Sequence, residues 1–169
     1  MIKQILVIFS FAIILNSCKD SKNYFTFDEV IQYKLDSEID TESLFSENQK
    51  NESDSLRKAI VIGEKPNKID DSLFVNNLKK IGFNKIKVNP FKYAEINKLY
   101  SEKMSPLIKT STTCEPIYRD ILIFKNTGKI IGISKVCFEC LRSENIGLSG
   151  KLKAFEREND YKDLKNYLQ

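Results

Sequence analysis

The sequence predicts an α+β domain in which a small antiparallel sheet of three to five strands carries helices on one face. Two observations predict this class. Two apolar runs, Ile121–Phe124 and Ile130–Ile133, flank Asn126-Thr127-Gly128, which is a typical turn sequence of a β-hairpin. Apolar residues also recur at helical spacing in residues 71–81 and 91–103. With 41% apolar and 30% charged residues, the composition is that of a globular protein.

The N-terminal segment has the features of a bacterial lipoprotein signal peptide. Lys3 precedes an apolar run from Ile5 to Leu15, which is too short for a membrane span of about 20 residues but suits the core of a signal peptide. The run ends in Leu15-Asn16-Ser17-Cys18, which resembles a lipobox. We therefore expect residues 1–17 to be removed and Cys18 to carry the lipid. An ordinary signal peptide with a chance cysteine is the alternative.

This interpretation divides the chain into a removed signal peptide (1–17), a lipidated tether (18–26) and a single α+β domain (27–169). Two or more acyl chains on Cys18 would hold the protein firmly in a bilayer. We expect a location in the bacterial cell envelope, on the periplasmic or the surface side of a membrane, with the bilayer as partner. No protein partner follows from the sequence.

The elements of the first half follow from alternation and spacing. Residues 27–36 alternate apolar and polar side chains and predict a strand. Residues 36–55 are acidic and rich in Ser and Asn, which favours a loop or a poorly ordered helix, and residues 56–62 are of uncertain type. Asp70-Asp71-Ser72 offers a cap for the helix 71–81, and a short strand at 85–89 precedes the helix 91–103.

The second half contains the hairpin, predicted over residues 117–136. A three-residue loop ending in Gly128 would place Lys125 opposite Lys129. The same register places Cys114 opposite Cys140 and Arg119 opposite Lys135. After the hairpin we expect a loop at 143–150, an edge strand or turn at 151–155, and a frayed helix at 160–168.

Three cysteines, Cys114, Cys137 and Cys140, should cluster at the open end of this hairpin. Outside the cytosol disulfides persist, so a structural Cys114–Cys140 disulfide with Cys137 buried and unpaired is one interpretation. A second is a soft-metal site for zinc or copper formed by the three thiolates. A third is thiol–disulfide redox chemistry at the C-x-x-C of residues 137–140, although that motif usually opens a helix. We expect the disulfide and no cofactor.

Arg119 and Asp120 are the remaining candidates, as ligand-binding residues in the hairpin. A structural Arg-Asp salt bridge to other parts of the domain is the favoured alternative. The chain has no His, which removes the common catalytic pairs and His-ligated metals, and we expect no enzymatic activity. Its lysines are scattered rather than interleaved with stacking aromatics, so we expect no nucleic-acid binding.

The hairpin motif also carries a family resemblance. The pattern Cys114-x-Pro116-x-x-Arg119-Asp120, followed by Cys137-Phe138-x-Cys140, resembles a module of uncharacterised small lipoproteins from Bacteroidota-type bacteria. The resemblance covers roughly the last third of the chain. It implies a lipid-anchored envelope protein in which the cysteines are important, and it implies no activity.

Overall fold

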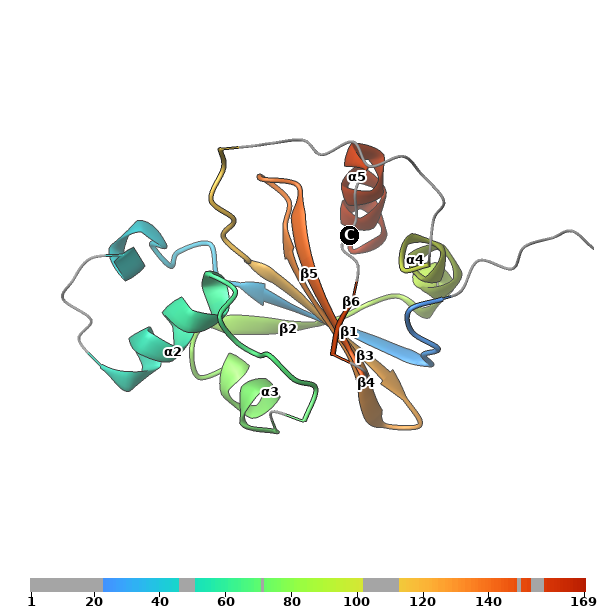
Figure 1. The fold of residues 1–169 in the computed structure, drawn as a ribbon, viewed down its shortest axis with the longest axis horizontal. Coiled ribbons are helices and arrows are strands. Elements are labelled where there is room, and N and C mark those ends of the chain that lie inside the picture. Colours follow the sequence, from blue (N-terminus) through green and yellow to red (C-terminus); the bar gives the residue numbers. More distant parts are fainter. Residues whose placement is uncertain (1–22, 46–50, 71, 102–112, 149, 153–156) are drawn as a thin grey trace, which may run out of the picture.

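The structure is a computed structural model that describes residues 23–45, 51–70, 72–101, 113–148, 150–152 and 157–169. It confirms the α+β class with a small antiparallel sheet (Figure 1). The strand order is β2-β1-β3-β4-β5-β6, and each neighbouring pair is antiparallel. The three-residue strand β6 extends five longer strands at one edge. The signal segment and Cys18 lie outside the described residues.

The strands are β1 (Glu29–Leu35), β2 (Phe83–Lys87), β3 (Asp120–Asn126), β4 (Lys129–Cys137), β5 (Arg142–Gly147) and β6 (Gly150–Leu152). The α-helices are α2 (Glu52–Val61), α3 (Ser72–Leu78), α4 (Tyr93–Leu99) and α5 (Glu158–Tyr167), and the 3₁₀ helices are η2 (Glu42–Phe45) and η3 (Pro90–Lys92). Within the described part of the chain, no helix is long and apolar enough to span a membrane.

The helices cover both faces of the sheet, whereas we expected them on one. β3 explains the difference, because four consecutive residues, Ile121 to Phe124, are completely buried. Successive strand residues point to opposite faces, so both faces need a cover. α2 and α3 pack against Ile121 and Ile123, and α4 and α5 pack against Leu122 and Phe124 (Figure 1).

The hairpin forms, but its predicted register is wrong. The loop has two residues, Thr127 (φ 48°) and Gly128 (φ 78°), and Asn126 pairs with Lys129. An irregularity between Phe124 and Lys125 then shifts the pairing further, so that Lys135 lies opposite Ile121 rather than Arg119. The carboxylate of Asp28 accepts a hydrogen bond of 2.8 Å from the Thr127 N–H. This contact from before β1 supports the left-handed conformation of Thr127, which a non-glycine residue rarely adopts.

One element that the sequence left undecided is a helix, and one segment predicted as a loop is a strand. Residues 52–61 form α2, whose N-cap Asn51 accepts a hydrogen bond of 2.9 Å from the Asp54 N–H. β5 occupies the segment predicted as a loop. The strand was not predicted because its buried side chains include Ser143 and Asn145, so the sequence shows no apolar alternation there. Packed structure also begins inside the segment assigned to the tether, because Phe25 is buried.

The other predicted elements are present with shifted ends. The strands predicted at 27–36 and 85–89 are β1 and β2, and the helices predicted at 71–81 and 91–103 are the shorter α3 and α4. The terminal helix α5 is anchored by the buried side chains of Tyr161 and Leu164.

Candidate functional site

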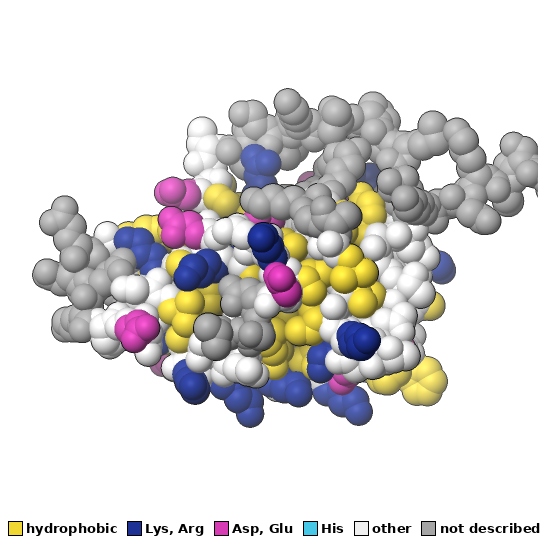
Figure 2. Space-filling view, turned by 60° about the horizontal axis from the view of Figure 1, so that its bottom comes forward, with side chains coloured by type: hydrophobic (Ala, Val, Ile, Leu, Met, Phe, Trp, Pro, Cys, Tyr) yellow, Lys and Arg dark blue, Asp and Glu magenta, His cyan; other side chains and the backbone are white. Residues whose placement is uncertain are grey.

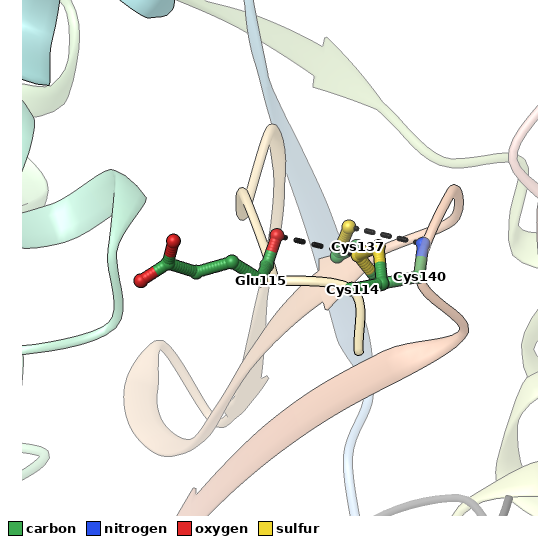
Figure 3. The surroundings of a disulfide bond; sticks show 4 residues. All are labelled: Cys114, Glu115, Cys137 and Cys140. Carbon is green, nitrogen blue, oxygen red and sulfur yellow. Dashed lines mark hydrogen bonds between the residues drawn. A yellow bond between two sulfur atoms is a disulfide. The ribbon is translucent and has the colours of Figure 1, made fainter. Parts of the chain in front are cut away.

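The cysteines meet where β4 ends and the chain turns into β5. Cys114 and Cys140 are joined as a disulfide with a Cα–Cα distance of 5.6 Å, in agreement with the predicted pairing (Figure 3). Cys137 is buried and forms no disulfide with the other described cysteines. The Cys140 N–H donates to the Cys137 Sγ over 3.4 Å, which closes the C-x-x-C turn.

The two bonded cysteines lie outside the ladder of β3 and β4, so their pairing does not come from the hairpin register. Cys140 Sγ also lies 3.3 Å from the carbonyl oxygen of Glu115 (Figure 3). A disulfide sulfur has no proton to donate, so this is a packing contact. Leu141, at φ 51°, turns the chain into β5 rather than into a helix. The C-x-x-C therefore lacks the strand-to-helix setting of thioredoxin-like motifs.

The described residues contain no group of three His, Cys, Asp or Glu side chains arranged to hold a metal ion. The disulfide occupies two of the three sulfurs proposed as zinc or copper ligands. Binding of such a metal by all three thiolates would therefore require the disulfide to be reduced first.

A hollow of about 260 Å³ lies beside Cys137, at the ends of β1, β3 and β4 and against the C-terminal end of α5. It brings together the predicted residues Arg119, Asp120 and Cys137. Its lining consists of Gln32, Lys34, Ile117, Arg119, Asp120, Cys137, Phe138, Glu139, Lys165, Leu168 and Gln169. The sequence pattern did not identify Gln32, Lys34 and Lys165 as site residues, because they belong to elements far from the hairpin motif.

Asp120 is the chemically unusual member of this hollow. It is only 6% exposed, and its Oδ1 accepts a hydrogen bond of 2.7 Å from Gln32 Nε2. Burial raises the pKa of Asp120, while the Gln32 hydrogen bond and the positive charges of Lys34, Lys165 and Arg119 act in the opposite direction. Lys34 is the residue directly opposite Asp120 in the β1–β3 ladder.

Gln32 leaves one polar atom of this pair unsatisfied. The residue is 4% exposed, and its Oε1 has no hydrogen-bond partner within the described part of the chain. Buried polar atoms in native structures are almost always paired, and an unpaired one calls for an explanation. Gln32 and Asp120 together form the polar wall of the hollow.

Arg119 contributes to the hollow and also fastens a neighbouring loop. Its guanidinium donates over 3.4 Å to Thr41 Oγ1 and to the carbonyl oxygens of Asp36 and Ile39. These bonds connect the start of β3 to the loop after β1. They differ from the expected salt bridge, because the acceptors are a hydroxyl and two backbone carbonyls.

Lys135, on the other face of β4, is a buried charge that the sequence did not reveal. It is completely buried, and its Nζ donates to the carbonyl oxygens of Gly63 (2.8 Å) and Lys65 (3.1 Å) and pairs with Glu144 (2.7 Å). The ring of Tyr118 lies 5.6 Å from this Nζ. The sequence held one indication of this burial. Lys135 alternates with Ile133 and Cys137 along the strand, and both of these side chains are buried.

The environment of Lys135 is closely packed. Burial raises the pKa of Tyr118 to about 12, with further contributions from the charges of Glu144 and Cys137. Gly63 has φ 91°, and a Cβ there would lie 2.8 Å from the Tyr118 ring. A glycine is therefore needed for this loop to reach Lys135. Lys135 has a partner for each of its three protons, which indicates a structural role.

Comparison with known proteins gives no match to this chain, whether by family model, by curated protein sequence or by solved structure. The geometry of the hollow is therefore the main basis for a functional proposal.

Proposed function

We propose that this protein is a lipid-anchored lipoprotein of the bacterial cell envelope whose domain is a non-catalytic binding module for a small polar ligand. The lipobox-like sequence ending at Cys18 supports the anchor. The buried Gln32–Asp120 pair in the wall of the hollow is the observation that carries the binding role.

The pair is incomplete without a ligand. Gln32 Oε1 is buried and lacks a donor among the described residues, and Asp120 is buried against a single amide. Leaving a buried acceptor unsatisfied costs roughly 1–3 kcal/mol. A ligand that donates a hydrogen bond to the Asp120 carboxylate, and that reaches Gln32 Oε1 after a small shift of this side chain, would remove this cost.

The surroundings of the pair narrow the class of ligand. Besides Asp120 the lining has three basic side chains, Lys34, Lys165 and Arg119, and one further acidic one, Glu139. This excess of positive charge favours a ligand that also carries an anionic group. A hollow of 260 Å³ is smaller than typical drug-binding pockets of roughly 300–1,000 Å³. Both properties point to a small zwitterion of the size of an amino acid or a dipeptide.

The chemistry of the pair suits binding better than proton transfer. Asp120 is hydrogen-bonded to the side-chain amide of Gln32, and an amide does not exchange protons as an acid or a base near neutral pH. A general acid or base requires a proton-transfer partner within hydrogen-bond reach. The pair therefore supports recognition of a ligand.

Ligand binding can be tested by calorimetry and thermal unfolding with the common amino acids and a set of dipeptides as probes. At least one probe should raise the unfolding temperature of the wild-type protein. Gln32→Leu and Lys34→Gln should weaken its binding, whereas Lys85→Gln, on the exposed strand β2, should not. If no probe binds, or if all three variants bind equally, the hollow is not the site.

The anchor has a separate test. A labelled fatty acid supplied to the producing cells should appear on the wild-type protein and be absent from the Cys18→Ala variant. Label on the variant would contradict the assignment of Cys18.

The second candidate function is thiol–disulfide exchange or soft-metal binding, and the position of Cys137 favours it. Its thiol lies one turn from a disulfide, with its Sγ 3.4 Å from the Cys140 N–H. Attack of the Cys137 thiolate on Cys140 Sγ would form a Cys137–Cys140 bond and release Cys114 as a thiolate, without any external oxidant. Mass mapping of the disulfides, thiol titration and elemental analysis for zinc and copper would distinguish these alternatives.

A further inference from the structure

Phe91 is a large apolar side chain on the surface of this domain. It is 90% exposed, compared with 80% for Leu148, 44% for Phe45 and 37% for Ile86. A fully exposed phenylalanine has no packing role within its own domain, and exposed aromatic residues beside cations are common at membrane interfaces. The position of Phe91 relative to the proposed lipid anchor suggests what the exposed ring contacts.

The ring is presented by a hydrogen-bonded turn. The side chain of Asn89 accepts a hydrogen bond of 3.1 Å from the Phe91 N–H, and the carbonyl oxygen of Asn89 accepts one of 2.9 Å from the Lys92 N–H. Pro90 occupies the first turn of η3, where its constrained φ angle suits a helix start. This turn leads directly into α4, so the backbone that carries the exposed Phe91 is held in place at both ends.

The first described residues run along α4 toward this turn. Asn23 forms a bridge with Ser101, and the Tyr24 N–H donates over 2.7 Å to the Tyr100 carbonyl oxygen, both just after the C-terminal end of α4. At the other end of the helix the ring of Phe27 lies 5.7 Å from that of Tyr93. Figure 1 shows the start of the described chain beside α4.

The tether length keeps this part of the domain close to a bilayer. Five residue steps separate Cys18 from Asn23, and a fully extended chain covers at most roughly 3.6 Å per residue, or about 18 Å. The seven residues of α4 add about 10 Å between Asn23 and the η3 turn. A membrane that holds an acylated Cys18 would therefore lie within reach of Phe91.

The charges beside Phe91 fit a negatively charged lipid surface. Lys87 on β2, Lys92 on η3 and Lys98 in the last turn of α4 are all exposed, whereas Glu95 on α4 is partly buried. The Nζ of Lys92 also lies 5.6 Å from the centre of the Tyr167 ring. Figure 2 shows a row of basic side chains along the lower margin of the molecule, with hydrophobic side chains at one end of the row. Lysines near an anionic membrane surface are attracted to it within about a Debye length.

We propose that the η3 turn is a membrane-contact surface, in which Phe91 enters the headgroup region of an anionic bilayer while Lys87, Lys92 and Lys98 lie over the headgroups. This inference rests on the proposed anchor at Cys18. The contact would give the domain one orientation on the membrane rather than free rotation about its tether.

The absence of Trp from the sequence allows a direct test. Full-length acylated protein carrying Phe91→Trp is incorporated into vesicles of phosphatidylethanolamine and phosphatidylglycerol. The emission of the introduced indole should be shifted to the blue relative to the same protein without vesicles, and brominated lipids should quench it. Phe45→Trp, on η2 at the opposite side of the molecule, is the matched control and should show neither effect (Figure 1).

The outcomes separate the two proposals. Mass analysis shows first whether the chain carries lipid, and a chain without lipid overturns the anchor and this inference with it. If the chain is acylated but the indole from Phe91→Trp is quenched no more than that from Phe45→Trp, the anchor stands and the contact surface is wrong. Equal quenching in neutral phosphatidylcholine vesicles would overturn the role of the lysines.

Discussion

Lys135 and Asp120 are two buried charges on neighbouring strands, and their surroundings differ. Val136 is the residue opposite Asp120, so Lys135 and Asp120 are close in the sheet but point to opposite faces. Lys135 has three acceptors and a ring beside it. Asp120 has one hydrogen bond from an amide whose own oxygen has no partner among the described residues, and it faces a hollow.

The comparison shows that burial of a charge does not by itself indicate function. A buried charge with all its hydrogen bonds formed contributes to the uniqueness of a fold, and removing it leaves its partners unpaired. A buried charge with too few partners beside a hollow is a better candidate for binding. The number of partners and the access to solvent distinguish the two cases here.

Among single substitutions, the largest expected loss of stability is that of Lys135→Met. Lys135→Met should lower the free energy of unfolding by roughly 3–5 kcal/mol, because Glu144 and two carbonyl oxygens lose their common donor. Urea unfolding measures this change. Lys125→Met is the control on the same hairpin, since its partly exposed pair with Glu29, at 3.6 Å, should contribute less than about 1 kcal/mol. Equal effects of the two variants would show that Lys135 is not a structural charge.

The Cys114–Cys140 disulfide fixes a segment that contacts both Lys135 and the hollow beside Asp120. The segment that follows Cys114 carries Tyr118, which lies over Lys135, and Arg119, which lines the hollow. Replacing both Cys114 and Cys140 by Ser should lower the free energy of unfolding by about 3.5 kcal/mol, because the bond spans 26 residues. Cys137→Ala retains the bond and is the control. Reductant should destabilise the wild-type protein but not the double variant. Equal destabilisation of both proteins would show that the reductant does not act through this disulfide.

The helix layers test whether the two faces are equally packed cores. Leu78 of α3 and Leu164 of α5 are both completely buried, on opposite faces. Leu78→Ala and Leu164→Ala should each cost roughly 2–5 kcal/mol, and the double variant should cost the sum, because the two sites share no contacts. Unfolding midpoints measure all three variants. An unchanged midpoint for either single variant would show that its helix does not cover a core.

The smallest expected effect is a gain in stability at neutral pH, from Asp120→Asn. Because burial raises the pKa of Asp120 above its ordinary value of 3.8, the folded protein binds this proton more tightly than the unfolded chain. The corresponding stability is present at pH values below 3.8 and is lost as the pH rises through the folded-state pKa. Asp120→Asn should therefore be at least as stable as the wild type at neutral pH, and this difference should disappear toward pH 3.5. Unfolding in urea across this range measures it, and a variant that is less stable at pH 7 would contradict it.

Much of the framework could be predicted from local sequence. The apolar run Ile121–Phe124, the turn around Gly128 and the helical spacing near Leu78 each depend on neighbouring residues. β5 could not be predicted in this way, because its inward residues include Ser143 and Asn145, whose burial depends on partners from other elements. The half of the candidate site within the hairpin, Arg119, Asp120 and Cys137, was predicted, whereas Gln32 and Lys165 were not.

The sequence alone determined the α+β class and the hairpin, because hydrophobic periodicity and turn residues are local properties. It also suggested that Cys114 pairs with Cys140, but from a hairpin register that the structure does not have. Only the tertiary structure decided the turn type, the two-sided helix cover and the partners of Lys135 and Asp120. Asp28 supports the turn at Thr127 from 99 positions away, and Gln32 reaches Asp120 from 88 positions away. Such contacts depend on which strands become neighbours, and no local pattern encodes that choice.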